Sequence, residues 1–325
     1  MILGIECTAH TFGVAVCDKG EVLANVRDMY KPESGGIIPN KSAEHHKQVA
    51  ERIYLEALKV ARIKEKEIDA IAISNDPGLA PCLHAGLNFA KSKANELGLK
   101  IIPVNHCVAH LEIGRSVGAK DPVLLYTSGA NTQVIAFASG KYRIFGETLD
   151  VGVGNFIDKF ARFTGIGFPG GPKIEEYALK GRNYIELPYV VKGMDVSFSG
   201  MQSKLQELYS KGEKIEDLSF SLQETAFAML VEAAERALAH TGKKELVLGG
   251  GVGCNKRLQE MCKIMCKERG AKFFCPERQF LVDNAGMIAF TGELMWKADK
   301  KCGLDADKID IEARQRTDQV EVFWR

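Results

Sequence analysis

The chain has 325 residues, of which 46% are hydrophobic and 26% are charged, and its 43 Lys and Arg residues balance 42 Asp and Glu residues to leave a formal net charge of +1. This composition excludes a disordered chain, and the length is sufficient for two domains of about 150 residues each. The balance also argues against a protein that binds nucleic acid through bulk positive charge. If a polynucleotide is the substrate, we expect other subunits to supply much of the binding.

The sequence shows no membrane or secretory signal. No apolar run approaches the roughly 18 residues that cross a bilayer, and Met1 to Ile5 begins a strand pattern instead of a signal peptide. Nine cysteines are scattered without a CxxC pair, which is typical of reduced, buried thiols. We therefore expect a cytoplasmic protein that does not interact with membranes.

Short β-type runs alternate with longer stretches of helical period, which is the pattern of an α/β protein. In chain order, the first half predicts strands over 2–7, 12–18 and 21–28, a helix over 42–62, a strand over 68–74, a helix over 83–97 and a strand over 101–104. In the second half, Leu246 to Leu248 predicts a strand that leads through a four-glycine turn to a helix over 256–266.

Two segments of the chain follow one plan. Without gaps, Glu6 to Gly20 (ECTAHTFGVAVCDKG) aligns with Tyr126 to Gly140 (YTSGANTQVIAFASG), and each runs from strand to strand and then into a tight turn. We expect two similar folding units with a boundary near residue 120. The N-terminal lobe would span residues 1–120 and the C-terminal lobe residues 121–325, with a last helix able to return to the first lobe.

The repeated turns are candidate anion sites. Hydroxyl groups of Thr8, Thr11, Ser128 and Thr132 stand at strand-to-strand corners beside backbone amides, and two such corners could hold a polyphosphate between them. The four-glycine turn also lets the backbone approach a flat ligand closely. The chain contains neither a Walker motif nor a convincing GxGxxG fingerprint, which excludes the P-loop and Rossmann classes.

His106 and His110 stand four residues apart in NHCVAHLE. On a helix both imidazoles would point the same way and could share a metal, although two unrelated surface histidines are an equally common origin of this spacing. Asp283 precedes a helical stretch and is a candidate third ligand; histidine with carboxylate suits iron or zinc. A zinc protease would need Glu directly after the first histidine, where this chain has Cys107.

Eight motifs occur in order along the whole chain: SGGIIPNKSAEHH (34–46), DPGLAPCLHAGL (76–87), NHCVAHLEIG (105–114), YTSGANTQV (126–134), GFPGGPKIE (167–175), SFSG (197–200), GGGVGCNKRL (249–258) and DNAGMIAFTG (283–292). Together they resemble the universal tRNA adenosine threonylcarbamoyltransferase family, in its archaeal and eukaryotic branch. The resemblance implies a two-lobed α/β fold of the actin/hexokinase/acetate kinase superfamily, built from duplicated ribonuclease-H-like units with nucleotide and metal in the interdomain cleft.

The resemblance also implies roles for individual residues. One divalent metal, iron rather than zinc, would be bound by His106, His110 and Asp283, with the Tyr126 hydroxyl close enough to join. The bound nucleotide would be threonylcarbamoyl-adenylate, ATP or AMP. Its phosphate would be held by Tyr126, Thr127, Ser128, Gly129 and Ala130, its ribose by Asp158 and Glu175, and its nucleoside by Gly171 and Asn255. From the residues alone, solvated acids are the commoner explanation of Asp158 and Glu175, and no general base is indicated. The resemblance makes Tyr126 the one catalytic candidate.

The implied reaction transfers a threonylcarbamoyl group from threonylcarbamoyl-adenylate to the exocyclic amine of the adenosine 3′ of the anticodon, in tRNAs that read codons beginning with A, and releases AMP. The implied partners are tRNA and the subunits of a KEOPS-type complex, including a small kinase-like protein and a small dimerising protein on the N-terminal helices. The alternatives are an ATP-dependent kinase and a nonenzymatic nucleotide-switch protein of the same superfamily. A metalloprotease is disfavoured.

Overall fold

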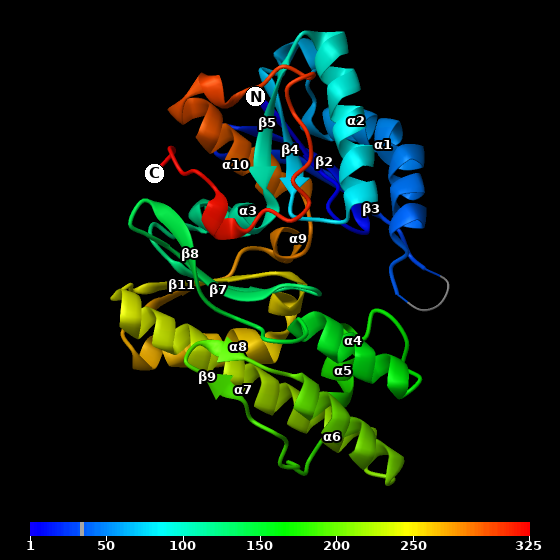
Figure 1. Ribbon diagram of the computed structural model, residues 1–325, viewed down its shortest axis with the longest axis vertical. Helices are drawn as coiled ribbons and strands as arrows, with labels where there is room; N and C mark the ends of the chain where they lie inside the picture. The colour runs from blue at the N-terminus through cyan, green and yellow to red at the C-terminus, as the bar shows by residue number, and fades with distance from the viewer. Residues whose placement is uncertain (33–35) are drawn as a thin grey trace. The chain divides into compact units, whose positions relative to one another are not determined.

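The computed structural model describes residues 1–32 and 36–325, which form two compact units (Figure 1). Unit 1 comprises Met1–Ser116, Gly140–Tyr142 and Asp283–Arg325, and unit 2 comprises Val117–Ser139 and Arg143–Val282. Residues 283–325 therefore pack with the beginning of the chain. The division into lobes at residue 120 stays a prediction. Ser34 and Gly35, which open one of the eight motifs, lie outside the described residues.

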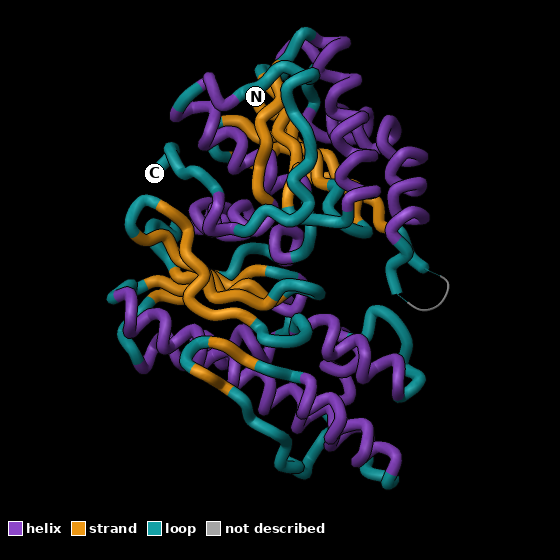
Figure 2. The backbone as a smooth tube through the Cα atoms, viewed as in Figure 1, coloured by secondary structure: helices purple, strands orange, loops and turns teal. Residues whose placement is uncertain are grey.

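Unit 1 is built on a five-stranded sheet in the order β3-β2-β1-β4-β5 (strands in Figure 2). β1 pairs with β2 in antiparallel and with β4 in parallel orientation, and β5 continues the parallel part. The strands are β1 (Ile2–Glu6), β2 (Thr11–Asp18), β3 (Glu21–Met29), β4 (Ala70–Asp76) and β5 (Lys100–Asn105). The helices are α1 (Pro39–Ala61), α2 (Ala80–Leu97), α3 (His106–Glu112) and α10 (Ala285–Ala298).

Helices cover both faces of this sheet, and β1 shows why. All five residues of β1 are buried, and side chains alternate between the two faces of a strand. Leu3 and Ile5 contribute to the core with α1 and α2. On the other face a Cβ atom at Gly4 would come within 2.5 Å of the Ala289 backbone, so only glycine lets α10 pack this closely on the sheet.

Unit 2 repeats the plan with the sheet order β12-β11-β6-β7-β8. Its strands are β6 (Val123–Thr127), β7 (Thr132–Ala138), β8 (Lys141–Glu147), β11 (Glu245–Gly249) and β12 (Lys272–Phe274), and a separate small pair is formed by β9 (Val191–Lys192) and β10 (Asp195–Val196). Its helices are α4 (Val153–Phe163), α5 (Gly171–Ala178), α6 (Ser199–Ser210), α7 (Ile215–Thr241), α8 (Lys256–Glu268) and α9 (Arg278–Leu281).

The two sheets confirm the duplicated fold predicted from the internal repeat. In each sheet three strands that are consecutive in the chain lie side by side, the first two of them antiparallel, and the first strand pairs in parallel with the next of two further parallel strands. The matching turns also agree: Lys19 and Gly20 have φ values of 52° and 84°, and Ser139 and Gly140 have 53° and 77°. Two successive positive φ angles are the requirement of a type I′ hairpin turn. Among the described residues, no helix is both long and apolar enough to cross a membrane.

Candidate functional site

Helix α3 carries the histidine pair directly after β5. The Asn105 side chain accepts a hydrogen bond from the backbone N–H of Val108 at 3.0 Å and so caps the helix at its first turn. His106 and His110 are both buried, and their ring centroids lie 4.9 Å apart. The two imidazoles therefore share one face of α3, as their spacing predicts.

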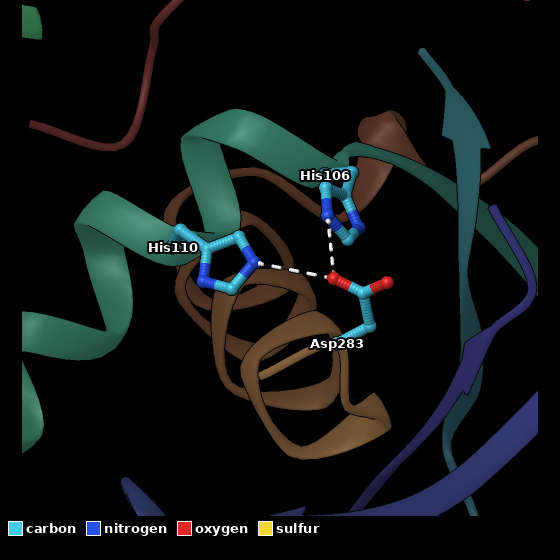
Figure 3. Close-up of side chains that lie close together, drawn as sticks. All are labelled: His106, His110 and Asp283. Atoms are coloured by element: carbon cyan, nitrogen blue, oxygen red, sulfur yellow. Dashed lines mark ion pairs between the residues drawn. The ribbon is translucent and has the colours of Figure 1, made fainter. Parts of the chain in front are cut away.

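Asp283 joins this pair from the segment before α10. The Asn284 side chain accepts a hydrogen bond from the Met287 N–H at 3.0 Å and caps α10, which holds its neighbour Asp283 at the helix entrance. Oδ1 of Asp283 lies 3.4 Å from Nε2 of His106 and 3.9 Å from Nε2 of His110 (Figure 3). The Asp283 side chain is 20% exposed, so the cluster opens to solvent on the carboxylate side.

The three side chains fit a metal ion. One ligand atom from each lies within 4.8 Å of the other two. Metal–ligand bonds of roughly 2.1 Å place adjacent ligand atoms about 3.4 Å apart in a tetrahedral shell and up to about 4.2 Å apart in wider arrangements. The distances to Asp283 Oδ1 fall within this range. Two imidazoles and one carboxylate suit iron or zinc and leave positions for a further ligand.

The pKa of each side chain in the cluster depends on its neighbours. Burial alone would lower the pKa of His106, but the charge of Glu6 and the hydrogen bonds with Asp283 raise it well above its usual value. Burial, together with the charge of His106, lowers the pKa of His110. Burial alone would raise the pKa of Asp283, yet its bonds to both histidines hold it well below its ordinary value. The carboxylate is thus ionised, as a metal ligand has to be.

Cys107 occupies the position where a zinc protease would carry its Glu base. Burial raises the pKa of the Cys107 thiol to about 11, so the thiol stays protonated at neutral pH. A protonated thiol cannot remove a proton from water. The structure therefore agrees with the sequence in disfavouring a metalloprotease.

Sequence reasoning missed two acids behind the histidines. Glu6 ends β1, and its Oε2 lies 2.9 Å from Nδ1 of His106. Asp76 ends β4, accepts a hydrogen bond from the Asn105 side chain, and has its pKa raised to about 7 by burial. Their position in the sequence could have indicated them, because Glu6, Asp76 and Asn105 each stand at or near the end of a predicted strand. The strands β1, β4 and β5 are parallel neighbours, so their carboxyl ends meet at one edge of the sheet.

In unit 2, Tyr126 and Thr127 end strand β6 and are both buried. The Thr127 hydroxyl donates a hydrogen bond to the Gly249 carbonyl at 3.0 Å, which ties β6 to the start of the four-glycine turn. Gly250 has a φ of 87°, and a Cβ atom there would lie 2.4 Å from the Thr127 carbonyl oxygen. Glycine is therefore required at position 250, where the four-glycine turn passes close to the backbone at the end of β6.

The turn after Thr127 packs against the beginning of α4. Ser128 and Asn131 exchange hydrogen bonds of 2.9 to 3.0 Å that close the turn, while Gly129 and Ala130 at its tip are exposed. A Cβ atom at Gly152 would lie 2.4 Å from the Gly129 carbonyl oxygen, and one at Gly154 would lie 2.8 Å from the Gly129 Cα. The N–H groups of Gly154 and Asn155 at the start of α4 donate to the carbonyl oxygens of Ser128 and Gly129 at 3.1 and 2.9 Å, so α4 holds the turn in place and leaves its tip exposed.

The remaining predicted nucleotide residues also have structural partners. Asp158 in α4 accepts a hydrogen bond from the Gly170 N–H at 2.7 Å, and Glu175 in α5 accepts one from the Lys256 N–H at 2.7 Å. The Asn255 side chain caps α8 by accepting bonds from the N–H groups of Arg257 and Leu258 at 2.9 and 3.2 Å. A Cβ atom at Gly171 would meet no atom within 4 Å, so this side of the glycine is open. Their roles toward a nucleotide stay predictions.

Residues 21–290 match the sequence profile of a family described as TsaD: tRNA N6-adenosine threonylcarbamoyltransferase. The chain belongs to the TsaD family. The matched range contains every residue predicted for the metal and the nucleotide, whereas Glu6 lies before it.

Full-length relatives agree with this membership. The tRNA N6-adenosine threonylcarbamoyltransferase of Thermococcus kodakarensis is 52% identical over 323 residues, which cover 99% of each chain. A probable bifunctional tRNA threonylcarbamoyladenosine biosynthesis protein of Methanosarcina mazei is 51% identical over 327 residues. That match covers 99% of this chain and 59% of the relative, so the TsaD-family chain spans about three fifths of the bifunctional protein.

Solved structures of distant proteins confirm the fold class. T. kodakarensis HypF matches with a TM-score of 0.63 at 16% identity, over 91% of this chain and 47% of HypF. Component A of the (R)-2-hydroxyglutaryl-CoA dehydratase of Acidaminococcus fermentans matches with a TM-score of 0.57 at 14% identity, over 89% of this chain and 96% of that one. The TsaD-family chain therefore has the actin/hexokinase-like fold, and identities this low carry no functional argument.

Proposed function

We propose that this TsaD-family chain transfers a threonylcarbamoyl group from threonylcarbamoyl-adenylate to the exocyclic amine of the adenosine 3′ of the anticodon, in tRNAs that read codons beginning with A. Membership of the family carries the proposal, and the cluster of His106, His110 and Asp283 supports it. In the reaction the amine nitrogen attacks the carbamoyl carbonyl carbon. The bond from that carbon to the phosphate oxygen breaks, AMP leaves, and the amine loses one proton to solvent.

His106, His110 and Asp283 would hold one divalent metal, for which we propose iron rather than zinc. When bound, such an ion supplies Lewis-acid polarisation of a substrate oxygen and a fixed point for orienting the substrate. The two imidazoles are buried, whereas Asp283 lies at the solvent-exposed side of the cluster, so a substrate oxygen can approach from that side. We also propose the hydroxyl of Tyr126 as a ligand of this metal, as the family resemblance implies.

The turn from Thr127 to Ala130 would hold the leaving phosphate. Its tip is exposed while its base is closed by Ser128 and Asn131, so the backbone is preorganised before the ligand arrives. Asp158 and Glu175 would accept hydrogen bonds from ribose hydroxyls, since a carboxylate offers about four acceptor positions and can serve the backbone as well. Gly171 and Asn255 would contact the nucleoside.

An aromatic amine is a weak nucleophile, so we expect placement of adenosine against the activated carbonyl to contribute more than a strong base. Tyr126 remains the catalytic candidate among the predicted residues. It is buried at the end of β6 and precedes the phosphate-binding turn directly. Replacing Tyr126 with Phe removes the hydroxyl and keeps the aromatic ring, so this variant tests the role of the hydroxyl alone.

We further propose that the chain works in the cytoplasm as the catalytic subunit of a KEOPS-type complex with a small kinase-like protein and a small dimerising protein. Its net charge of +1 supports shared binding of tRNA, because a chain without a basic excess gains little from release of counterions. On α1, Leu55 and Val60 are 54% and 52% exposed, which supports α1 as the docking helix of the dimerising protein.

The test is a reconstituted transfer reaction. The chain is mixed with the partner subunits, unmodified tRNA and threonylcarbamoyl-adenylate made from threonine, bicarbonate and ATP, and the tRNA is then digested for mass spectrometry. We expect N6-threonylcarbamoyladenosine with the unsubstituted chain and with His84→Ala, an exposed histidine on α2, but not with Asp283→Asn. Phosphoryl transfer from ATP without modified nucleoside would instead favour the kinase alternative.

A further inference from the structure

We propose that Glu6 is a positioning residue that makes Nε2, rather than Nδ1, the metal-binding nitrogen of His106. The inference rests on the proposed metal site and adds to it a residue outside the predicted ligand set. It concerns which of two chemically similar ring nitrogens is available, and this choice sets the direction from which His106 can bind an ion.

The contact between Glu6 and His106 is short and fully buried. Oε2 of Glu6 lies 2.9 Å from Nδ1 of His106, and neither the Glu6 nor the His106 side chain is more than marginally accessible. A carboxylate oxygen accepts hydrogen bonds and a ring N–H donates them, so this geometry makes Nδ1 the donor. Nε2 on the opposite side of the ring is then the nitrogen from which a metal can displace the proton, and it is Nε2 that faces Asp283 at 3.4 Å.

Glu6 is itself held in place from its other oxygen. Oε1 accepts a hydrogen bond from the Thr8 N–H at 2.8 Å and a second from the Thr8 hydroxyl. The Thr8 carbonyl in turn accepts a bond from the Leu79 N–H at 2.8 Å, and a Cβ atom at Gly78 would lie 2.7 Å from the Thr8 carbonyl oxygen. The Glu6 carboxylate thereby joins the end of β1 to the first residue of α3, and the Thr8 backbone joins the same segment to the loop before α2.

This arrangement does what an outer-sphere carboxylate does for a ligating histidine. Accepting the Nδ1 proton fixes the tautomer and the ring orientation, and it raises the basicity of Nε2. Loss of such a partner typically weakens metal binding by about 10-fold to 100-fold. A purely structural role for Glu6, as an acceptor for the loop at Thr8, would leave the choice of ring nitrogen unchanged.

Three variants separate these roles. Glu6→Gln keeps the size of the side chain but can present an N–H donor to Nδ1, which favours the tautomer with the proton on Nε2. Thr8→Val removes the hydroxyl bond that holds Glu6 and, with it, the longer contact of 3.4 Å between that hydroxyl and Nδ1 of His106, while the Glu6 carboxylate stays in place. Glu112→Gln is the matched control: Glu112 is a fully buried carboxylate on the same helix α3, where it accepts a bond from Trp324 Nε1 at 3.1 Å.

Two measurements are made on the full chain. Zn²⁺ affinity is measured by competition with a chromophoric chelator, with circular dichroism to confirm that each variant is folded. Long-range ¹H–¹⁵N spectra of histidine-labelled protein loaded with Zn²⁺ report which nitrogen of His106 carries the proton. We expect a proton on Nδ1 in the unsubstituted chain, an affinity about 10-fold to 100-fold lower in Glu6→Gln, a smaller loss in Thr8→Val and none in Glu112→Gln.

The outcomes distinguish this inference from the proposed function. An unsubstituted chain that binds no Zn²⁺ would overturn the metal site and the role of Glu6 together. Binding that His106→Ala abolishes but Glu6→Gln leaves unchanged would overturn the role of Glu6 alone. A proton found on Nε2 of His106 in the loaded protein would also overturn it, whatever the affinities. If Glu6→Gln fails to fold, the Thr8→Val affinity and the spectrum of the unsubstituted chain decide the question.

Discussion

Nε2 of His106 lies 3.4 Å from Oδ1 of Asp283, although one residue follows β5 and the other precedes α10. The contact exists because α10 packs across the face of the sheet whose edge carries α3. Local sequence places each residue at a helix start, and the topology of unit 1 brings the two starts together.

Replacing either residue should empty the metal site while leaving the fold intact. We expect His106→Ala and Asp283→Asn to purify with less than about a tenth of the metal of the unsubstituted chain, because each removes one of three protein ligands. Metal content by mass spectrometry and folding by circular dichroism check this. His84→Ala, which changes an exposed histidine on α2, serves as control. Unchanged metal in His106→Ala would remove that residue from the site.

A methyl group at Gly154 should weaken AMP binding. The added Cβ of Gly154→Ala would lie 2.8 Å from the Gly129 Cα and 3.0 Å from the Gly129 N, so the phosphate turn has to move. We expect at least a tenfold loss of AMP affinity by isothermal titration calorimetry, which corresponds to about 1.4 kcal/mol. Gly200→Ala is the control, since its Cβ would meet its nearest atom only at 3.9 Å. Equal losses in both variants would argue against the turn as the phosphate site.

The stability of the metal-free chain should fall in mild acid because of His46. Burial lowers the pKa of His46 to about 4, whereas the unfolded chain has a histidine pKa of about 6.5. Between these values the unfolded state binds a proton that the folded state does not, so this residue costs stability as pH falls. From pH 7 to pH 5 the cost is about 2 kcal/mol. Urea unfolding of His46→Leu should show a pH dependence weaker by this amount; an identical dependence would refute the assignment.

A charge on the exposed apolar part of α1 should prevent docking of the dimerising subunit. We expect Leu55→Asp and Val60→Asp to elute separately from that subunit in size-exclusion chromatography, since an aspartate in the contact would lose its hydration without gaining a partner. Leu179→Asp is the matched control, because Leu179 is 76% exposed but belongs to unit 2. Loss of the complex in the control alone would place the contact on unit 2.

Much of the fold could be predicted from the sequence because its elements repeat at regular periods. The strands of the first meander follow from short β-type runs, the long helix α1 from its helical period, and the turn at Lys19 and Gly20 from its residue types. The histidine pair followed from helical spacing in the same way. These features depend on neighbours within a few residues along the chain.

The rest depends on contacts between distant segments. A single acid such as Glu6 at the end of an apolar strand has no periodic signature, and its meeting with His106 requires the parallel pairing of β1, β4 and β5. Likewise, the family resemblance predicts a nucleoside contact for Asn255, but only the structure shows that its side chain also caps α8. Sequence patterns indicated which residue types were present and did not indicate their hydrogen-bond partners.

The most direct test of the proposed transfer is its stoichiometry. With tRNA, the partner subunits and threonylcarbamoyl-adenylate supplied, AMP release and N6-threonylcarbamoyladenosine in the digested tRNA are measured in the same samples over time. The proposed function predicts one AMP for each modified adenosine, with both products dependent on the chain and on tRNA. AMP release that continues without tRNA modification, or modification that proceeds equally without the chain, would contradict it.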